Sequence, residues 1–172
     1  MTNNVISRLE SLNSLREIPR FELKWLESAI VAGCLIEHGD SLLLCRRAIE
    51  PRYGLWTLPA GFLENGESVE EGARRETREE ACAEVEILQL FTIFSLTHIN
   101  QVYMMFRARL HEPVFSPGEE SLDVRLFEES EIPWKELAFP VMHQTLRHYF
   151  EDRSKGEFNT HIFFPPGGLT SA

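Results

Sequence analysis

The sequence has few cysteines and no long apolar run. Its three cysteines, Cys34, Cys45 and Cys82, lie in apolar or helical stretches without Cys-x-x-Cys spacing. This distribution argues against a disulfide framework and against a zinc site. No apolar stretch approaches the roughly 18 residues of a membrane-spanning helix, and no signal peptide opens the chain. We therefore expect a cytoplasmic protein that does not contact a membrane.

Basic residues are also scarce. Lys and Arg number 17 against 27 Asp and Glu in a chain of 172 residues, which gives a net charge of −10. Because nucleic-acid backbones are bound by basic surfaces, we expect no nucleic-acid partner. A small phosphorylated substrate is compatible with this charge, since a bound metal ion inverts the charge of its own pocket. With 43% hydrophobic and 26% charged residues, the composition is that of a globular domain.

What the chain has in excess is carboxylate, concentrated in residues 61–83. The segment reads GFLENGESVEEGARRETREEACA. Ser68 followed three residues later by Glu71 forms a capping box, so the sequence predicts a helix that begins just after Ser68. In this helix the positions i, i+3 and i+4 place three carboxylates on one face, where they repel one another. They are Glu76, Glu79 and Glu80.

A divalent cation would remove this repulsion. Mg²⁺ binds through one or two carboxylates together with water and substrate phosphates, so the carboxylate face is typical of half a magnesium-phosphate site. Arg75 precedes Glu79 by four residues and is placed to pair with it and orient it. The alternative is a solvated acidic helix with i,i+4 ion pairs. Spacing alone does not separate the two.

The same segment resembles the Nudix box, which is a glycine, five residues, a glutamate, seven residues, then Arg-Glu-apolar-any-Glu-Glu-any-Gly-apolar. Six positions match this motif: Gly61, Glu67, Arg75, Glu76, Glu79 and Glu80. Thr77 replaces an apolar residue, Cys82 replaces the glycine after the helix, and Ala83 is small for the last apolar position. That glycine normally adopts a left-handed conformation, so Cys82 affects the helix end and removes no carboxylate.

The resemblance implies a fold and a chemistry. The fold is the Nudix fold of the α+β class, an α/β/α sandwich with a mixed β-sheet between helices. The chemistry is hydrolysis of a diphosphate that links a nucleoside to a second group. Glu76, Glu79 and Glu80 would hold Mg²⁺, or Mn²⁺ as a substitute, supported by Glu67 and Arg75. Glu79 or Glu80 would also activate the attacking water, and in an exposed site we expect Glu80→Gln to abolish turnover but not folding.

Further candidates lie outside the box. In several Nudix enzymes the general base comes from a later loop, where this chain has Glu119, Glu120 and Asp123, and we take Glu120 as the catalytic candidate. A solvated turn explains the same residues equally well.

Candidate substrate-binding residues precede and follow the box. They are Arg46, Arg47 and Arg52 for phosphates, Tyr53 and Trp56 for stacking on a base, and His98 for a hydrogen bond to the nucleotide. The alternatives are that Trp56 belongs to the core, that Tyr53 is a hairpin residue, and that His98 is solvated.

Hydrophobic patterns predict the remaining elements. Apolar runs at 29–36 and 41–45 around the turn His38-Gly39-Asp40 indicate a hairpin. Further strands are predicted at 55–60, 85–94, 102–110 and 122–127, and a last helix from about Pro140. We divide the chain into an N-terminal helical extension (1–27), a Nudix domain (28–153) and a C-terminal tail (154–172). The tail would dock on the body or on a second subunit through Phe158, Ile162, Phe163 and Phe164.

Two segments around the box indicate which Nudix subgroup the chain resembles. LLLCRRAIEPRYGLWTLPAGFLENGES and EESLDVRLFEESEIPWKELAFP are most similar to the Nudix subgroup that hydrolyses ADP-ribose and dinucleotides such as NADH and FAD, releasing AMP. The zinc ribbon that precedes the domain in some members has no cysteine counterpart here. Many members of the subgroup are dimers, and we expect a homodimer.

Other functions stay open. One is a nucleoside triphosphate pyrophosphatase, and another is a Nudix module that binds a nucleotide without catalysis. Such sensors commonly lose box carboxylates, whereas every one is present here. A third is an interaction protein whose helix is acidic by chance, in which case replacing Glu79 and Glu80 by Gln would leave its function intact.

Overall fold

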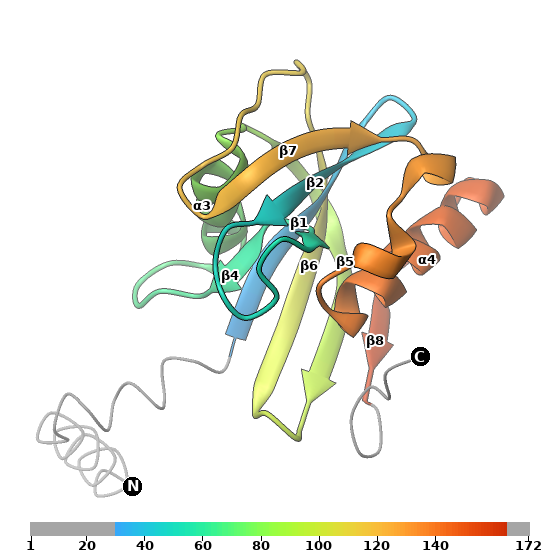
Figure 1. The fold of residues 1–172 in the computed structure, drawn as a ribbon. Coiled ribbons are helices and arrows are strands. Elements are labelled where there is room, and N and C mark those ends of the chain that lie inside the picture. Colours follow the sequence, from blue (N-terminus) through green and yellow to red (C-terminus); the bar gives the residue numbers. More distant parts are fainter. Residues whose placement is uncertain (1–29, 165–172) are drawn as a thin grey trace, which may run out of the picture.

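The computed structural model describes residues 30–164. These residues form an eight-stranded sheet with α-helices on its two faces (Figure 1). The predicted extension at 1–27 and the last residues of the predicted tail lie outside the described range. Among residues 30–164 no helix is long and apolar enough to cross a membrane. The elements are β1 (Ile30–His38), β2 (Ser41–Arg47), β3 (Trp56–Thr57), β4 (Ala60–Phe62), α3 (Val69–Ala81), β5 (Glu86–Leu96), β6 (Gln101–Arg109), β7 (Ser121–Phe127), η2 (Glu129–Glu131), η3 (Trp134–Glu136), α4 (Pro140–Lys155) and β8 (His161–Phe163).

The sheet is mixed. Its strand order is β3-β2-β1-β6-β5-β8, with β4 added to β1 and β7 added to β2. β1 runs antiparallel to β2 and parallel to β6, and β5 runs antiparallel to β6 and parallel to β8. This arrangement confirms the predicted α+β class with a mixed sheet.

Alternating side chains of the central strands build a core on each face of the sheet. One core joins Leu35, Leu42 and Leu44 to Met142 and Leu146 of α4. The other core joins their sequence neighbours, including Ile36 and Leu43, to Ala73 and Ala81 of α3. Successive strand residues point to opposite faces, so the apolar runs of β1 and β2 supply side chains to both cores. The predicted sandwich follows from this pattern, with α3 and α4 on opposite sides of the sheet in Figure 1.

The predicted hairpin and last helix are both present. β1 and β2 pair across the turn at Gly39, and α4 begins with Pro140 and ends at Gly156 in the left-handed conformation. The single strand predicted at 55–60 is wrong, because the structure has the two short strands β3 and β4 there. The chain leaves β2 after β3 and crosses to β1, where Ala60 lies opposite Gly33.

The described part of the tail is integrated into the body. α4 runs to Lys155, so the boundary that we placed between 153 and 154 falls inside this helix. β8 then pairs with β5, and Phe163 stacks on Phe94 with ring centroids 4.5 Å apart. Phe158 also packs on the core, whereas Ile162 and Phe164 are exposed. Phe158 and Phe163 therefore dock on the body of their own chain, which is one of the two predicted docking partners.

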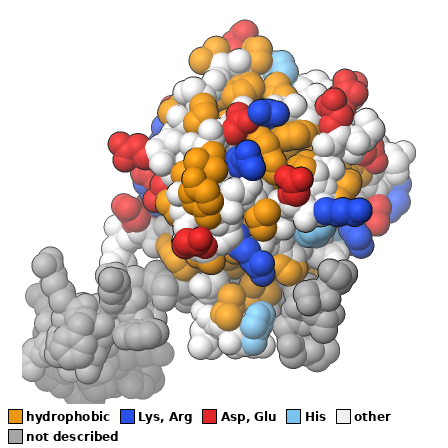
Figure 2. Space-filling model, viewed as in Figure 1, with side chains coloured by type: hydrophobic (Ala, Val, Ile, Leu, Met, Phe, Trp, Pro, Cys, Tyr) orange, Lys and Arg blue, Asp and Glu red, His pale blue; other side chains and the backbone are white. Residues whose placement is uncertain are grey.

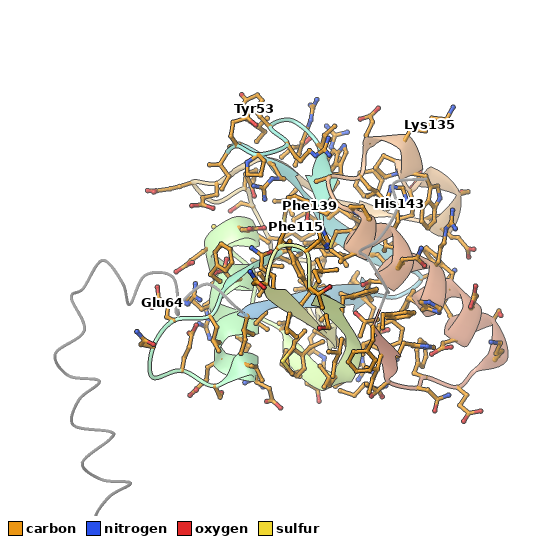
Figure 3. All side chains as sticks on the ribbon, turned by 90° about the horizontal axis from the view of Figure 1, so that it is seen from below. Tyr53, Glu64, Phe115, Lys135, Phe139 and His143 are labelled. Carbon is orange, nitrogen blue, oxygen red and sulfur yellow. The ribbon has the colours of Figure 1, made fainter. Side chains whose placement is uncertain are left out.

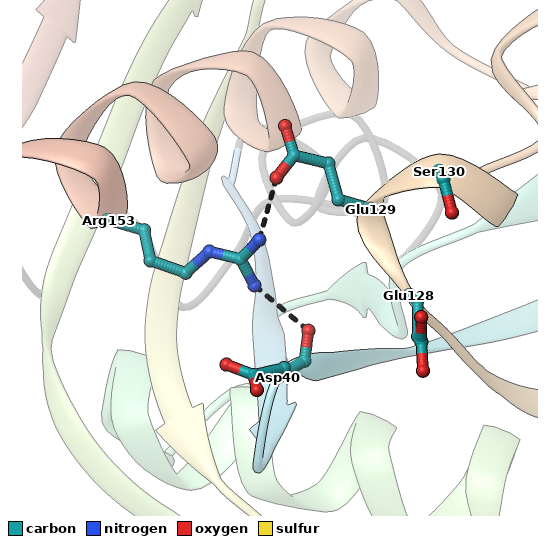
Figure 4. Close-up of a pocket in the computed structure, with 5 residues that line it drawn as sticks. All are labelled: Asp40, Glu128, Glu129, Ser130 and Arg153. Atoms are coloured by element: carbon teal, nitrogen blue, oxygen red, sulfur yellow. Dashed lines mark hydrogen bonds and ion pairs between the residues drawn. The ribbon is translucent and has the colours of Figure 1, made fainter.

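Arg153 links α4 to the β1–β2 turn and to η2. Its guanidinium donates to the carbonyl of Asp40 in the β1–β2 turn at 2.9 Å and to Glu129 of η2 at 2.7 Å. Figure 4 shows these bonds across a hollow of about 500 Å³ that Asp40, Glu129 and Arg153 help to line. Three segments distant in the sequence are therefore held together by one side chain.

Candidate active site

Local hydrogen bonds define both ends of the helix that carries the predicted carboxylates. Ser68 accepts a hydrogen bond from the Glu71 amide at 3.3 Å, and the Glu71 carboxylate accepts one from the Ser68 amide at 2.7 Å. At the other end Cys82 takes the left-handed conformation, with φ 47° and ψ 37°, and donates to the Arg78 carbonyl. The cysteine therefore occupies the conformation of the glycine it replaces, at a cost of about 1 kcal/mol.

Arg75 is the centre of the ion-pair network around the box. It donates to both oxygens of Glu67 at 2.7 and 3.1 Å, to Glu76 at 2.6 Å and to Glu79 at 3.0 Å. A further bond at 3.0 Å goes to the carbonyl of Phe62 at the end of β4. The predicted pair with Glu79 is confirmed. In addition, Arg75 fastens the β4–α3 loop to the helix, and these hydrogen bonds, chiefly those to Glu67, raise its pKa.

Gly61 allows a carboxylate to lie directly against β4. A Cβ at this position would come within 2.3 Å of Oε1 of Glu76. The Glu76 carboxylate therefore occupies the space that any other residue at position 61 would fill. This contact explains why the box needs a glycine fourteen residues before Arg75.

The three box carboxylates differ in exposure. Glu76 and Glu80 are 8% and 5% exposed, whereas the side chain of Glu79 is 56% exposed. Burial raises the pKa of Glu80 to about 8, helped by the charge of Glu76 and opposed by a hydrogen bond from the Ala60 amide. Burial also raises the pKa of Glu76, against the effect of Arg75. The expectation of an exposed site is wrong for Glu80, because the side chain enters the space between α3 and β4.

The loop before β7 closes the end of α3. The amides of Ser116 and Gly118 donate to the carbonyls of Ala81 and Glu80 at 2.9 and 3.1 Å. A Cβ on Gly118 would lie 1.6 Å from the Glu79 carbonyl oxygen, so only glycine fits here. The sequence around Gly118 does not reveal this contact, since the preceding proline signals a turn but not what the turn contacts.

This loop brings Glu120 to the box. The charge of Glu120 contributes to the raised pKa of both Glu76 and Glu80. Asp123 instead pairs with Arg125. Among the interactions described for residues 30–164, none links Glu119 or Asp123 to the box carboxylates. Of the three predicted loop carboxylates, the structure therefore brings Glu120 into the site.

The donor set fits a hard cation. Glu76, Glu79, Glu80 and Glu120 offer only carboxylate oxygens, and the charge of the buried Glu76 helps to raise the pKa of the buried Glu80. No group of three Asp, Glu, His or Cys side chains in the described part of the chain converges as a finished metal cage. Water and substrate oxygens would complete the coordination, which is the manner in which Mg²⁺ is usually bound.

Arg46 and Arg47 shape the loop that follows β2. Arg46 donates to the Gly54 carbonyl at 2.8 Å and Arg47 to the Pro51 carbonyl at 2.9 Å. Arg47 is 9% exposed, lies over the ring of Phe139, and lowers the pKa of Glu80 by its charge. It is thus the predicted phosphate-binding residue that the structure places beside the box.

Tyr53 and Arg52 project from this loop. Arg52 has a φ of 70°, and Tyr53 is 57% exposed. Figure 3 shows Tyr53 at the periphery of the molecule, away from the core. Figure 2 shows basic and acidic side chains interspersed with apolar ones on the face it presents, without a patch of one sign.

Two predicted substrate contacts are not supported by their positions. Trp56 is 6% exposed and packs edge-on against Phe127 with ring centroids 4.9 Å apart. It is a core residue, as the alternative proposed, and a base cannot stack on it. His98 is exposed in the β5–β6 turn, and none of the interactions described for residues 30–164 joins it to the box.

The matched domain model identifies the family. A model of the NUDIX domain matches residues 27–161. This chain belongs to the Nudix family. The match covers the carboxylate helix, the loop that carries Glu120, and the helix α4.

Individual relatives agree with this assignment. A crystal structure of a Nudix hydrolase from Nitrosomonas europaea is 52% identical and has a TM-score of 0.75, covering 80% of this chain and 79% of that one. An ADP-ribose pyrophosphatase of Methanocaldococcus jannaschii is 34% identical over 46% of this chain and 47% of its own. The human mitochondrial NAD(P)H pyrophosphatase NUDT13 is 35% identical over 63% of this chain and 29% of its own. The chain thus spans less than half the length of these two curated relatives.

Proposed function

We propose that this Nudix protein is a Mg²⁺-dependent pyrophosphohydrolase that cleaves the diphosphate of ADP-ribose, or of a dinucleotide such as NADH or FAD, and releases AMP. The observation that carries the proposal is the buried carboxylate Glu80, which lies with Glu76 and Glu120 beside Arg47. A divalent cation would neutralise buried carboxylates that lack enough positive charge nearby. The adjacent guanidinium of Arg47 would bind a phosphate. The names of two relatives, an ADP-ribose pyrophosphatase and an NAD(P)H pyrophosphatase, favour this substrate class.

Each group has a role in the reaction. Glu76, Glu79 and Glu80 would hold Mg²⁺, or Mn²⁺ in its place, with Glu120 beside them, and the ion would supply charge neutralisation and a more acidic bound water. Arg75 keeps Glu76 and Glu79 oriented through its bonds of 2.6 and 3.0 Å. Glu120, at the exposed edge, accepts the proton of the attacking water. Water adds to one phosphorus, the bond from that phosphorus to the bridging oxygen breaks, and Arg47 offsets the charge that develops on the leaving phosphate.

The loop after β2 would recognise the rest of the substrate. Arg46 and Arg47 donate hydrogen bonds to carbonyl groups of this loop, so the shape of the loop is set before a ligand binds. Tyr53 then offers an exposed ring for a base, and Arg52 a charge for a phosphate. A rigid loop loses little conformational entropy on binding. The homodimer, the cytoplasmic location and the absence of a nucleic-acid partner stay predictions.

A substrate panel tests the proposal. The protein is incubated with ADP-ribose, NADH, FAD, diadenosine polyphosphates and nucleoside triphosphates, with Mg²⁺ or with a chelator, and products are separated by chromatography. We expect chelator-sensitive release of AMP from one of the first three. Glu80→Gln should lower turnover by at least about 100-fold. Glu70→Gln is the matched control, because Glu70 lies on the same helix but its side chain is half exposed and pairs with Arg74 at 3.7 Å.

The other possible results of this assay correspond to the alternative functions. Release of pyrophosphate from a nucleoside triphosphate would indicate a triphosphate pyrophosphatase. Tight binding of one nucleotide without turnover would indicate a sensor. Equal turnover by the wild-type protein and Glu80→Gln would contradict the role assigned to Glu80.

A further inference from the structure

A buried hydroxyl without a partner lies at the start of β7. Ser121 is 8% exposed, and its Oγ is the one buried side-chain nitrogen or oxygen among residues 30–164 that makes no hydrogen bond. Buried polar groups are nearly always bonded, and an exception in a folded protein usually marks a bound water or ion, or a catalytic role. The position of this hydroxyl therefore needs an explanation.

The backbone connects Ser121 to the carboxylate helix in two steps. The Ser121 amide donates to the carbonyl of Gly118 at 3.1 Å, and the Gly118 amide donates to the carbonyl of Glu80 at 3.1 Å. On the other side Ser121 lies opposite Arg47 in the ladder between β2 and β7, where the register shifts. The backbone thus places Ser121 between the Glu80 segment of α3 and the arginine proposed to bind phosphate.

The pKa of a buried thiol responds to both side chains. Cys45 is 1% exposed, and after burial the charge of Glu80 is the next cause that raises its pKa, while the Ser121 hydroxyl lowers it. Glu80 and Ser121 therefore both act on the Cys45 thiol. Thiol and hydroxyl do not meet the geometry of a hydrogen bond, so Cys45 does not satisfy the Ser121 oxygen.

We propose that Ser121 is a positioning residue for Glu80, and that its hydroxyl, through one bound water, holds the Glu80 carboxylate in the orientation that ligates the divalent cation. A serine hydroxyl offers one donor and two acceptor sites, and a buried water typically makes about three hydrogen bonds. Groups that orient metal ligands are worth about 10–100-fold in metal affinity. This inference rests on the proposed function, since it assigns a partner to the same metal site.

Mn²⁺ binding to the full chain tests the inference without relying on turnover. Electron paramagnetic resonance measures free Mn²⁺ during titration of the wild-type protein, Ser121→Ala and Thr145→Val. Thr145 is the matched control because its hydroxyl is fully buried on the opposite face of the sheet and bonds to the Val141 carbonyl and to Thr92. Thermal melting of the metal-free proteins and hydrolysis of ADP-ribose, NADH and FAD are measured alongside.

Ser121→Ala should bind Mn²⁺ about 10-fold more weakly than the wild-type protein, and its metal-free melting temperature should not fall, because its Oγ bonds no protein group. Thr145→Val should melt lower and bind Mn²⁺ as the wild-type protein does. Equal Mn²⁺ affinity of Ser121→Ala and the wild-type protein would overturn the positioning role, and wild-type binding and turnover would still support the proposed function. A wild-type protein that neither binds Mn²⁺ nor hydrolyses any substrate would overturn both.

Discussion

Glu80→Gln should stabilise the metal-free protein, and increasingly so as the pH rises. Glu80 is 5% exposed, and its pKa is raised from 4.5 to about 8, first by burial and then by the charge of Glu76. The fold therefore disfavours the ionised carboxylate. Gln has nearly the same shape, keeps an oxygen that can accept from the Ala60 amide, and carries no charge.

The raised pKa sets the size and the pH range of this effect. A group whose pKa is higher in the folded state contributes stability below its unfolded pKa, and this contribution is lost as the pH rises through the folded pKa. For Glu80 the loss runs from about pH 4.5 to about pH 8. At about 1.4 kcal/mol per unit the upper bound is about 5 kcal/mol, and structural relaxation makes a loss of about 2–4 kcal/mol the expected value.

Urea denaturation between pH 4.5 and pH 9, with a chelator present, measures this effect. The free energies of unfolding of the wild-type protein and Glu80→Gln should be similar at pH 4.5 and should diverge by about 2–4 kcal/mol at pH 8 and above. Mg²⁺ should then raise the stability of the wild-type protein more than that of the variant. A difference that stays constant across this pH range would refute the reasoning.

Three further predictions follow from other contacts. Arg75→Gln should lower the free energy of unfolding in urea by about 2 kcal/mol, because it leaves partly buried carboxylates unpaired. Arg74→Gln should change it by less than about 0.5 kcal/mol, because Arg74 pairs with the exposed Glu70. Gly118→Ala should cost at least about 2 kcal/mol by thermal melting, since its Cβ would meet the helix backbone at 1.6 Å. Asp152→Asn should cost about 1–2 kcal/mol at pH 7, because the Asp152 carboxylate accepts from His161 and from a backbone amide.

The loss of stability in Asp152→Asn should depend on pH. Burial opposes ionisation of Asp152, but the His161 ring and the Asn159 amide hold its pKa below the usual range. The stability from the ionised form is therefore present above about pH 4 and is lost as the pH falls through the lower folded pKa. The deficit of Asp152→Asn should shrink in acid. A deficit that is unchanged at pH 3 would contradict this account.

Local signals explain what the sequence could predict. The capping box predicted the start of α3, two apolar runs around a turn predicted the β1–β2 hairpin, and a proline marked the start of α4. Each depends on residues within a few positions of one another. The spacing of Glu76, Glu79 and Glu80 likewise predicted a shared helix face, but it could not predict that Glu80 is buried, because burial depends on β4 and on the loop that follows β6.

Contacts between distant segments account for what was missed. Gly118 contacts the end of α3 about forty residues away in sequence, and nothing in its immediate neighbours specifies that contact. The splitting of the strand at 55–60 likewise depends on β1, which receives β4 opposite Gly33. Trp56 has the side chain of a base-stacking residue and the position of a core residue, so its residue type alone could not decide between the two.

The place of β8 at the edge of the sheet has a consequence for how the protein is made. Residues 161–163 cover the outer edge of β5 at Thr92–Phe94, and they follow α4 in the sequence, so they are synthesised after the rest of the sheet. Until those residues leave the ribosome, this edge of β5 is uncovered, and uncovered strand edges are sites of aggregation. A chain that ends after α4 should therefore yield less soluble protein than one that includes β8.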